Sequence, residues 1–209
     1  MTDVKVCGLT RPEDVALACA LGARYVGFNF AAASPRRISI EQARELAEAV
    51  APGVARVGVF VGESRDEILR AVEAASLDFI QLHRPFAAGD LDGAPRPILA
   101  VSHVGTRVSA APDSLLARCH AVLFDTAAPE RAGGTGRPFD WALVAERTWP
   151  VPVFLAGGLV PENVGEAIAR GRPAAVDVAS GAESAAGIKD PSRLRKFFRA
   201  VKEADALRA

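Results

Sequence analysis

Two side chains in this chain are suited to moving protons, and each follows a short apolar run. Cys7 follows the run Val4 to Val6, and Asp125 follows the run Ala121 to Phe124. A thiolate can act as a base and a protonated carboxyl as an acid. An ordinary cysteine is mostly protonated near neutral pH, whereas an ordinary aspartate is mostly ionised. A thiol and a carboxyl in these positions are a plausible pair for proton transfer on a small anionic substrate.

Glycine-rich turns follow the last two apolar runs of the chain. The residues of these turns are Gly157, Gly158, Ser180 and Gly181. Backbone amides beside a glycine can approach an anion closely because no Cβ intervenes, so the turns predict a phosphate site. A tight turn alone would account for any single glycine. A third stretch, Gly133 to Gly136, is typical either of a lid or of a merely flexible loop.

The elements that position these residues are predicted by an alternation of apolar runs with amphipathic stretches. The runs are Val4 to Val6, Tyr25 to Phe30, Ala55 to Val61, Phe79 to Leu82, Ile98 to Val101, Ala121 to Phe124, Val153 to Leu155 and Ala175 to Val178. Near-continuous apolar composition is typical of strands buried on both faces. Helix start signals fall between the runs: capping boxes begin at Ser39 and Ser64, Pro161 precedes a helix expected from Glu162, and a short helix is expected over Pro85 to Leu91.

Eight such repeats in 209 residues predict an α/β fold, a single-domain (β/α)8 TIM barrel over residues 1–209. A doubly wound sheet is the alternative. That fold would favour G-x-G-x-x-G after the first strand, where this chain has Cys7-Gly8-Leu9-Thr10. In a barrel the active site lies at the carboxyl ends of the strands. Cys7 and Asp125 would then face each other across one small substrate.

Composition excludes several other classes of function. The 25 basic and 25 acidic residues balance, which argues against nucleic acid or an anionic membrane as the main partner. No apolar run approaches the ~20 residues of a membrane span, and the first residues lack a secretory signal. The three cysteines form no CxxC pair, and the histidines lack metal-ligand spacing. We expect a cytoplasmic enzyme, monomer or homodimer, that acts on a small phosphorylated molecule without a metal or cofactor.

Short motifs at the expected strand ends occur in a characteristic order. They are Lys5-Val6-Cys7-Gly8-Leu9-Thr10, Gly27-Phe28, Ser34-Pro35-Arg36, Gln81-Leu82-His83, Phe124-Asp125-Thr126, Gly133-Gly134-Thr135-Gly136, Phe139-Asp140-Trp141, Leu155-Ala156-Gly157-Gly158-Leu159 and Asp177-Val178-Ala179-Ser180-Gly181, followed by Glu183, Gly187, Lys189 and Asp190. With these motifs, nearly the whole chain resembles the phosphoribosylanthranilate isomerase family of tryptophan biosynthesis.

The resemblance implies the Amadori rearrangement of N-(5-phosphoribosyl)anthranilate to 1-(2-carboxyphenylamino)-1-deoxyribulose 5-phosphate. It implies Cys7 as general base, Asp125 as general acid and Arg36 as the group that binds the anthranilate carboxylate. With these roles, we expect the pKa of Cys7 to be lowered and that of Asp125 to be raised. The glycine turns then bind the phosphate. His83 and Asp177 complete the expected substrate-binding set.

Other interpretations remain open at this point. Lys5 can pair with Asp177 of the neighbouring last strand, and its charge can also favour a Cys7 thiolate. A sugar-phosphate epimerase is one rival enzyme. The isomerase of histidine biosynthesis is another, but it resembles a two-carboxylate pattern with Asp in place of Cys7. A non-catalytic barrel that binds a phosphorylated ligand is the rival outside enzymes.

Overall fold

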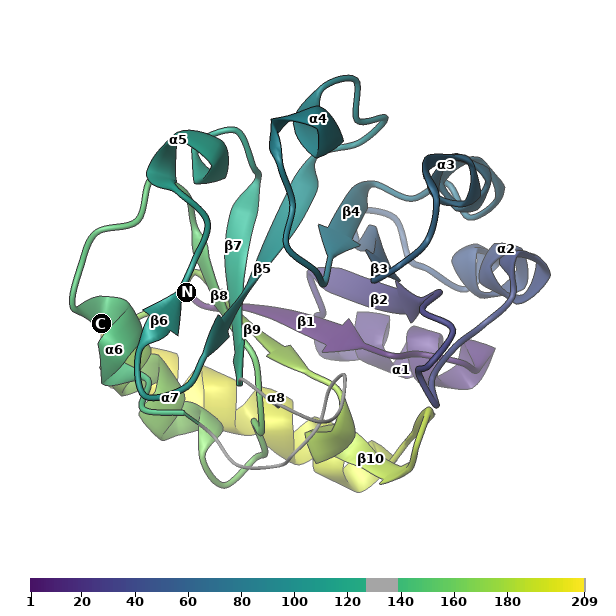
Figure 1. The fold of residues 1–209 in the computed structure, drawn as a ribbon. Coiled ribbons are helices and arrows are strands. Elements are labelled where there is room, and N and C mark those ends of the chain that lie inside the picture. The colour runs from purple at the N-terminus through teal and green to yellow at the C-terminus, as the bar shows by residue number, and fades with distance from the viewer. Residues whose placement is uncertain (127–138, 209) are drawn as a thin grey trace.

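A ring of parallel strands forms the centre of the computed structural model, which describes residues 1–126 and 139–208 (Figure 1). The ring has the order β4-β3-β2-β1-β9-β8-β7-β5, and the pairing of β4 with β5 closes it. Its strands are β1 (Asp3–Cys7), β2 (Tyr25–Asn29), β3 (Ala55–Phe60), β4 (Phe79–Leu82), β5 (Ile98–Val104), β7 (Ala121–Thr126), β8 (Val153–Leu155) and β9 (Ala175–Val178). Every strand expected from the sequence is present, and the (β/α)8 prediction is confirmed.

Helices lie around the outside of this ring (Figure 1). They are α1 (Pro12–Leu21), α2 (Ile40–Glu48), α3 (Arg65–Ala74), α4 (Ala88–Leu91), α5 (Asp113–Leu116), α6 (Ala142–Ala145), α7 (Val164–Gly171) and α8 (Pro191–Ala206). Both predicted capping boxes are formed: Ser39 accepts from the amide of Gln42, and Ser64 accepts from that of Glu67.

Several boundaries differ from the prediction. The fourth helix is a single turn beginning at Ala88, because the Asp90 side chain accepts the amide of Ala87 and closes the turn there. Helix α7 begins at Val164 rather than Glu162, because Asn163 accepts the amide of Val160 and donates to the carbonyl of Gly158. Strand β7 continues through Thr126, so Asp125 lies within its last two residues.

Two hydrophobic clusters fill the fold. The larger one lies between strands and helices, and the smaller one fills the barrel interior with residues such as Tyr25, Leu99, Leu123 and Phe154. Because side chains alternate along a strand, Leu123 and Asp125 of β7 share the inward face. Asp125 therefore lies next to the smaller hydrophobic cluster, toward the carboxyl end of the strand.

Short elements follow the carboxyl ends of strands β5 and β9. Strand β6 (Val108–Ser109) pairs antiparallel with the end of β5. After β9 come a 3-10 turn, η1 (Ser180–Ala182), and a hairpin of β10 (Glu183–Ala185) and β11 (Ile188–Lys189). In the part of the chain that the structure describes, no helix is long and apolar enough to cross a membrane.

Candidate active site

A cavity of about 470 Å³ opens at the carboxyl ends of the barrel strands. It is lined by every residue that the sequence assigned to the site: Cys7, Arg36, His83, Asp125, Gly157, Gly158, Asp177, Ser180 and Gly181. The barrel therefore brings together residues that lie far apart in the sequence, from Cys7 to Gly181. Residues Gly133 to Gly136, interpreted as a lid or a flexible loop, lie outside the described residues.

Cys7 is the last residue of β1 and is buried. Gly27 is its register partner on β2, and a Cβ at Gly27 would come within 2.7 Å of the Cys7 sulfur. Glycine at this position therefore makes room for the thiol. Burial raises the pKa of Cys7, while the charges of Lys5 and Lys189 act in the opposite direction. The expectation of a lowered thiol pKa was wrong, because loss of hydration outweighs the nearby cations.

Lys5 and Asp177 form an ion pair inside the barrel. Their Nζ and Oδ2 atoms are 3.0 Å apart, and the Lys5 side chain has no solvent exposure. The predicted pairing is confirmed, and it compensates a charge that would otherwise be costly to bury. The other carboxylate oxygen of Asp177, Oδ1, is buried without a hydrogen-bond partner among the described residues.

Asp125 lies on the inward face of β7 with 16% of its side chain exposed. Burial raises its pKa to about 6, although the amide of Thr126 donates to Oδ1 at 2.8 Å and partly opposes the shift. The direction expected from the sequence is confirmed. A carboxyl with this pKa is protonated in roughly one molecule in ten at neutral pH, compared with about one in a thousand for an ordinary aspartate.

His83 and His103 form a histidine pair beside Asp125. Their Nε2 atoms are 3.3 Å apart. Burial and the neighbouring His103 lower the pKa of His83 to about 4, so its ring is neutral at physiological pH. His103 was missed by sequence reasoning. His103 is the register partner of Asp125 on the neighbouring strand, and this pairing places it beside the carboxyl. The predicted strand ended at Val101, so the prediction did not include His103.

Arg36 reaches the cavity from the loop after β2, and its guanidinium binds Glu183. Its Nε and Nη2 atoms donate to Oε1 and Oε2 of Glu183 at 2.8 and 2.6 Å. Its side chain lies over Gly8, whose φ of +71° and lack of a Cβ permit the close approach. Glu183 was quoted among the sequence motifs without a role. A charged residue directly after a glycine turn was the available signal.

The glycine turns also line the cavity. Gly157 and Gly158 have φ values of +78° and +69°. A Cβ at Gly157 would lie 2.6 Å from the amide nitrogen of Thr126, and one at Gly181 would collide with the carbonyl oxygen of Leu159. Within residues 1–126 and 139–208, the amides of Gly157 and Gly158 donate no backbone hydrogen bond. These donors are available to a bound anion.

Gln81 is a second polar residue that the sequence placed in a motif but not in the site. It is buried at the cavity wall, and its Oε1 atom has no hydrogen-bond partner in the described part of the chain. A glutamine at an inward position of an apolar strand was the signal. No group of three or more His, Cys, Asp or Glu residues arranged to hold a metal ion occurs among the residues described.

Comparison with known proteins tests the resemblance inferred from the motifs. A sequence profile of the family described as N-(5'phosphoribosyl)anthranilate (PRA) isomerase matches residues 4–200. The chain belongs to the N-(5'-phosphoribosyl)anthranilate isomerase family. The predicted membership is therefore confirmed, and with it the assignment of the chain as an isomerase.

Individual members of the isomerase family match along their whole length. N-(5'-phosphoribosyl)anthranilate isomerase of Pseudomonas fluorescens is 42% identical over 207 residues, covering 96% of each chain. The crystal structure of the Thermus thermophilus isomerase has a TM-score of 0.83 and 37% identity, covering 97% of this chain and 99% of that one. Another isomerase was crystallised with reduced 1-(o-carboxyphenylamino)-1-deoxyribulose 5-phosphate; it has a TM-score of 0.80 and 33% identity, covering 97% of this chain and all of that one.

Proposed function

We propose that the chain catalyses the Amadori rearrangement of N-(5'-phosphoribosyl)anthranilate, with Cys7 as general base and Asp125 as general acid. One observation carries the assignment of roles. The thiol of β1 and the carboxyl of β7 line the same cavity at the barrel mouth of a chain in this isomerase family. The reaction needs a base and an acid acting on one sugar, and these two groups approach the cavity from different strands.

The first step opens the ribose ring. Asp125 gives its proton to the ring oxygen as the bond between that oxygen and C1 breaks, and the nitrogen lone pair forms a C=N bond to C1. The Cys7 thiolate then removes the proton on C2, whose C–H electrons form the C1=C2 bond while the C=N electrons return to nitrogen. The enol gains a proton at C1 and loses its hydroxyl proton, which leaves the ketone. No electrons enter or leave, so the chemistry needs no redox cofactor.

The two catalytic groups share one proton between them. The thiol holds this proton in the more populated form, because burial raises the pKa of Cys7 above its ordinary value and that of Asp125 is about 6. The reactive form has the same number of protons, with one moved from sulfur to carboxyl. Lys5 and Lys189 favour this form, since their positive charges stabilise a thiolate.

Substrate binding uses the polar atoms that have no partner in the described residues. The amides of the glycine turns bind the phosphate, as backbone donors without a competing hydrogen bond do. Asp177 Oδ1 and Gln81 Oε1 accept hydrogen bonds from ribose hydroxyls, which removes the cost of leaving them unpaired. Arg36 binds the anthranilate carboxylate. His83, neutral at physiological pH, lies against the sugar beside Asp125.

The direct test is to follow the fluorescence of freshly prepared N-(5'-phosphoribosyl)anthranilate after adding the protein. We expect the fluorescence to decay far faster than in the protein-free control, with the ketone product recovered. If the substrate decays at the spontaneous rate, the proposed reaction is wrong. The same preparation should bind inorganic phosphate, which checks that the phosphate site is intact.

Two coarser properties belong to the same proposal. We expect the chain to act in the cytoplasm on a small phosphorylated molecule, without nucleic acid or membrane as a partner. We expect it to be a monomer or a homodimer. Light scattering on the purified chain distinguishes these two states.

A further inference from the structure

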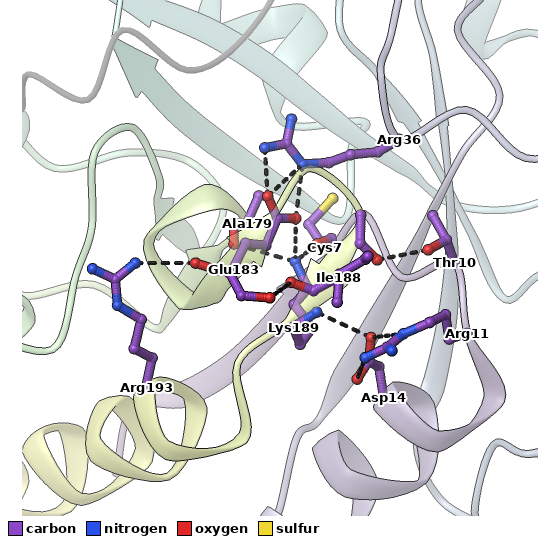
Figure 2. Close-up of polar contacts among 12 residues, drawn as sticks. Cys7, Thr10, Arg11, Asp14, Arg36, Ala179, Glu183, Ile188, Lys189 and Arg193 are labelled. Atoms are coloured by element: carbon purple, nitrogen blue, oxygen red, sulfur yellow. Dashed lines mark hydrogen bonds and ion pairs between the residues drawn. The ribbon is translucent and has the colours of Figure 1, made fainter.

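Three contacts hold the hairpin of β10 and β11 against β1, the loop that follows β1, and helix α1. Thr10 Oγ1 donates to the carbonyl of Gly187 at 2.6 Å, and the amide of Lys189 donates to Asp14 Oδ2 at 3.0 Å. Inside these contacts, Lys189 Nζ donates to the carbonyl of Cys7 at 2.7 Å. Figure 2 shows these contacts as one network. The hairpin therefore has a fixed position relative to the thiol-bearing strand.

Glu183, the first residue of this hairpin, holds its carboxylate between two cations. Oε1 lies 2.8 Å from Lys189 Nζ, and Oε2 lies 2.6 Å from Arg36 Nη2. The Glu183 side chain is 4% exposed and that of Lys189 is fully buried. Burial alone would raise the pKa of Glu183, but the hydrogen bond from Arg36 and the charge of Lys189 hold it below its ordinary value. The carboxylate is therefore ionised and rigidly held.

The orientation of Arg36 follows from this contact. Glu183 takes the edge of the guanidinium formed by Nε and Nη2. A guanidinium has five N–H donors. Within the described residues, Arg36 donates to Glu183 from Nε and Nη2 and not from Nη1. Arg36 lines the cavity, whereas Glu183 does not. The edge formed by Nη1 and Nη2 is thus left for a second carboxylate, which Arg can bind bidentately.

We propose that Glu183 is a positioning residue that, anchored by Lys189, holds Arg36 with its open edge toward the carboxylate of the substrate. This inference rests on the proposed function, because it assigns the group that orients one contact of the proposed substrate. Glu183 does not touch the substrate in this arrangement. Its removal should weaken recognition of the carboxylate specifically, rather than binding of the phosphate or the sugar.

The test compares two ligands that differ only in the carboxylate. One is reduced 1-(o-carboxyphenylamino)-1-deoxyribulose 5-phosphate, and the other is the reduced phenylamino compound that lacks the carboxylate. In the unsubstituted protein we expect the carboxylate to increase affinity by about 100-fold, as a bidentate charged contact does. In Glu183→Gln we expect this ratio to fall to about 10-fold or less, while the affinity of the phenylamino compound changes little. For the substrate, KM should rise more than kcat falls.

The matched control makes the same substitution, glutamate to glutamine, at a position outside the contacts of Glu183. Glu166→Gln removes a carboxylate that pairs with Arg170 on the exposed surface of α7. It should leave both affinities unchanged. If Glu183→Gln alone proves unstable in urea unfolding, the double variant Glu183→Gln with Lys189→Met removes both buried charges and leaves neither unpaired. Arg36 loses its orienting partner in that variant too.

The outcomes separate the two proposals. If the unsubstituted protein prefers the carboxylate compound and Glu183→Gln keeps the full ratio, the positioning role is wrong and the proposed function stands. If Glu183→Gln increases the preference, Glu183 competes with the substrate for Arg36, which also overturns the inference. If the unsubstituted protein binds neither compound, the proposed function fails and this inference fails with it.

Discussion

The Nε2 atom of His83 lies 3.6 Å from the Oδ2 atom of Asp125. Because the pKa of His83 is lowered to about 4, this contact joins a neutral ring to the carboxyl at physiological pH. A cationic histidine would lower the pKa of Asp125, whereas a neutral one leaves burial to raise it to about 6. A neutral histidine is therefore compatible with the proposed role of Asp125 as general acid.

A bell-shaped dependence of kcat/KM on pH should follow. Below about pH 6 both Asp125 and Cys7 are protonated and the base is lost, so activity should fall tenfold per pH unit. Activity should be level above pH 6 until the thiol ionises, above its ordinary pKa. His83→Asn should leave the acidic limb in place. An acidic limb near pH 4 in steady-state assays would contradict the shifted carboxyl.

Asp125→Asn should lower kcat while stabilising the fold. Loss of the acid should cost about 10²- to 10⁴-fold in kcat. The pKa of Asp125 rises on folding, so burying its ionised form lowers the free energy of unfolding. This loss of stability is complete above about pH 6 and disappears as the pH falls toward 4. We expect Asn to add about 3 kcal/mol of stability at pH 7.5 and roughly half of that at pH 5. Urea unfolding at both pH values measures this, and equal gains at both would refute the linkage.

Cys7→Ser should remove the base without removing the pocket. A serine hydroxyl ionises far less readily than a thiol, so kcat should fall by about 10²- to 10⁴-fold, or roughly 3 to 5 kcal/mol of barrier. Binding of the reduced product analogue, measured by calorimetry, should change little. Cys19→Ser, on α1 and outside the cavity, is the matched control and should keep full activity.

Gly181→Ala should damage the phosphate site through packing. A Cβ there collides with the backbone carbonyl of Leu159, so the two glycine turns must move apart. We expect a loss of about 1 to 3 kcal/mol of stability and a higher KM. Gly165→Ala is the control, because its Cβ would make an ordinary 3.8 Å contact with Ala204 within the α7–α8 packing. Unchanged KM in Gly181→Ala would argue against a phosphate at this turn.

The strands and the placement of Cys7 and Asp125 were predictable because apolar runs mark buried strands and barrel geometry assigns chemistry to their ends. The direction of the pKa shift of Cys7 was not predictable, because it depends on how fully the folded barrel excludes water from the thiol. The contact of Arg36 with Glu183 joins residues 147 positions apart, and local patterns carry no information about such pairs. The position of His103 beside Asp125 follows from strand register, which the sequence does not show.

The hairpin contact between Lys189 and the carbonyl of Cys7 spans 182 positions of the chain. During synthesis on a ribosome, the first strand emerges early, yet its neighbour β9 and the lysine that fastens its end are among the last segments made. The nascent polypeptide therefore cannot complete the surroundings of the proposed base until translation is almost finished. Fragments that stop before residue 189 should be inert however well their earlier strands associate.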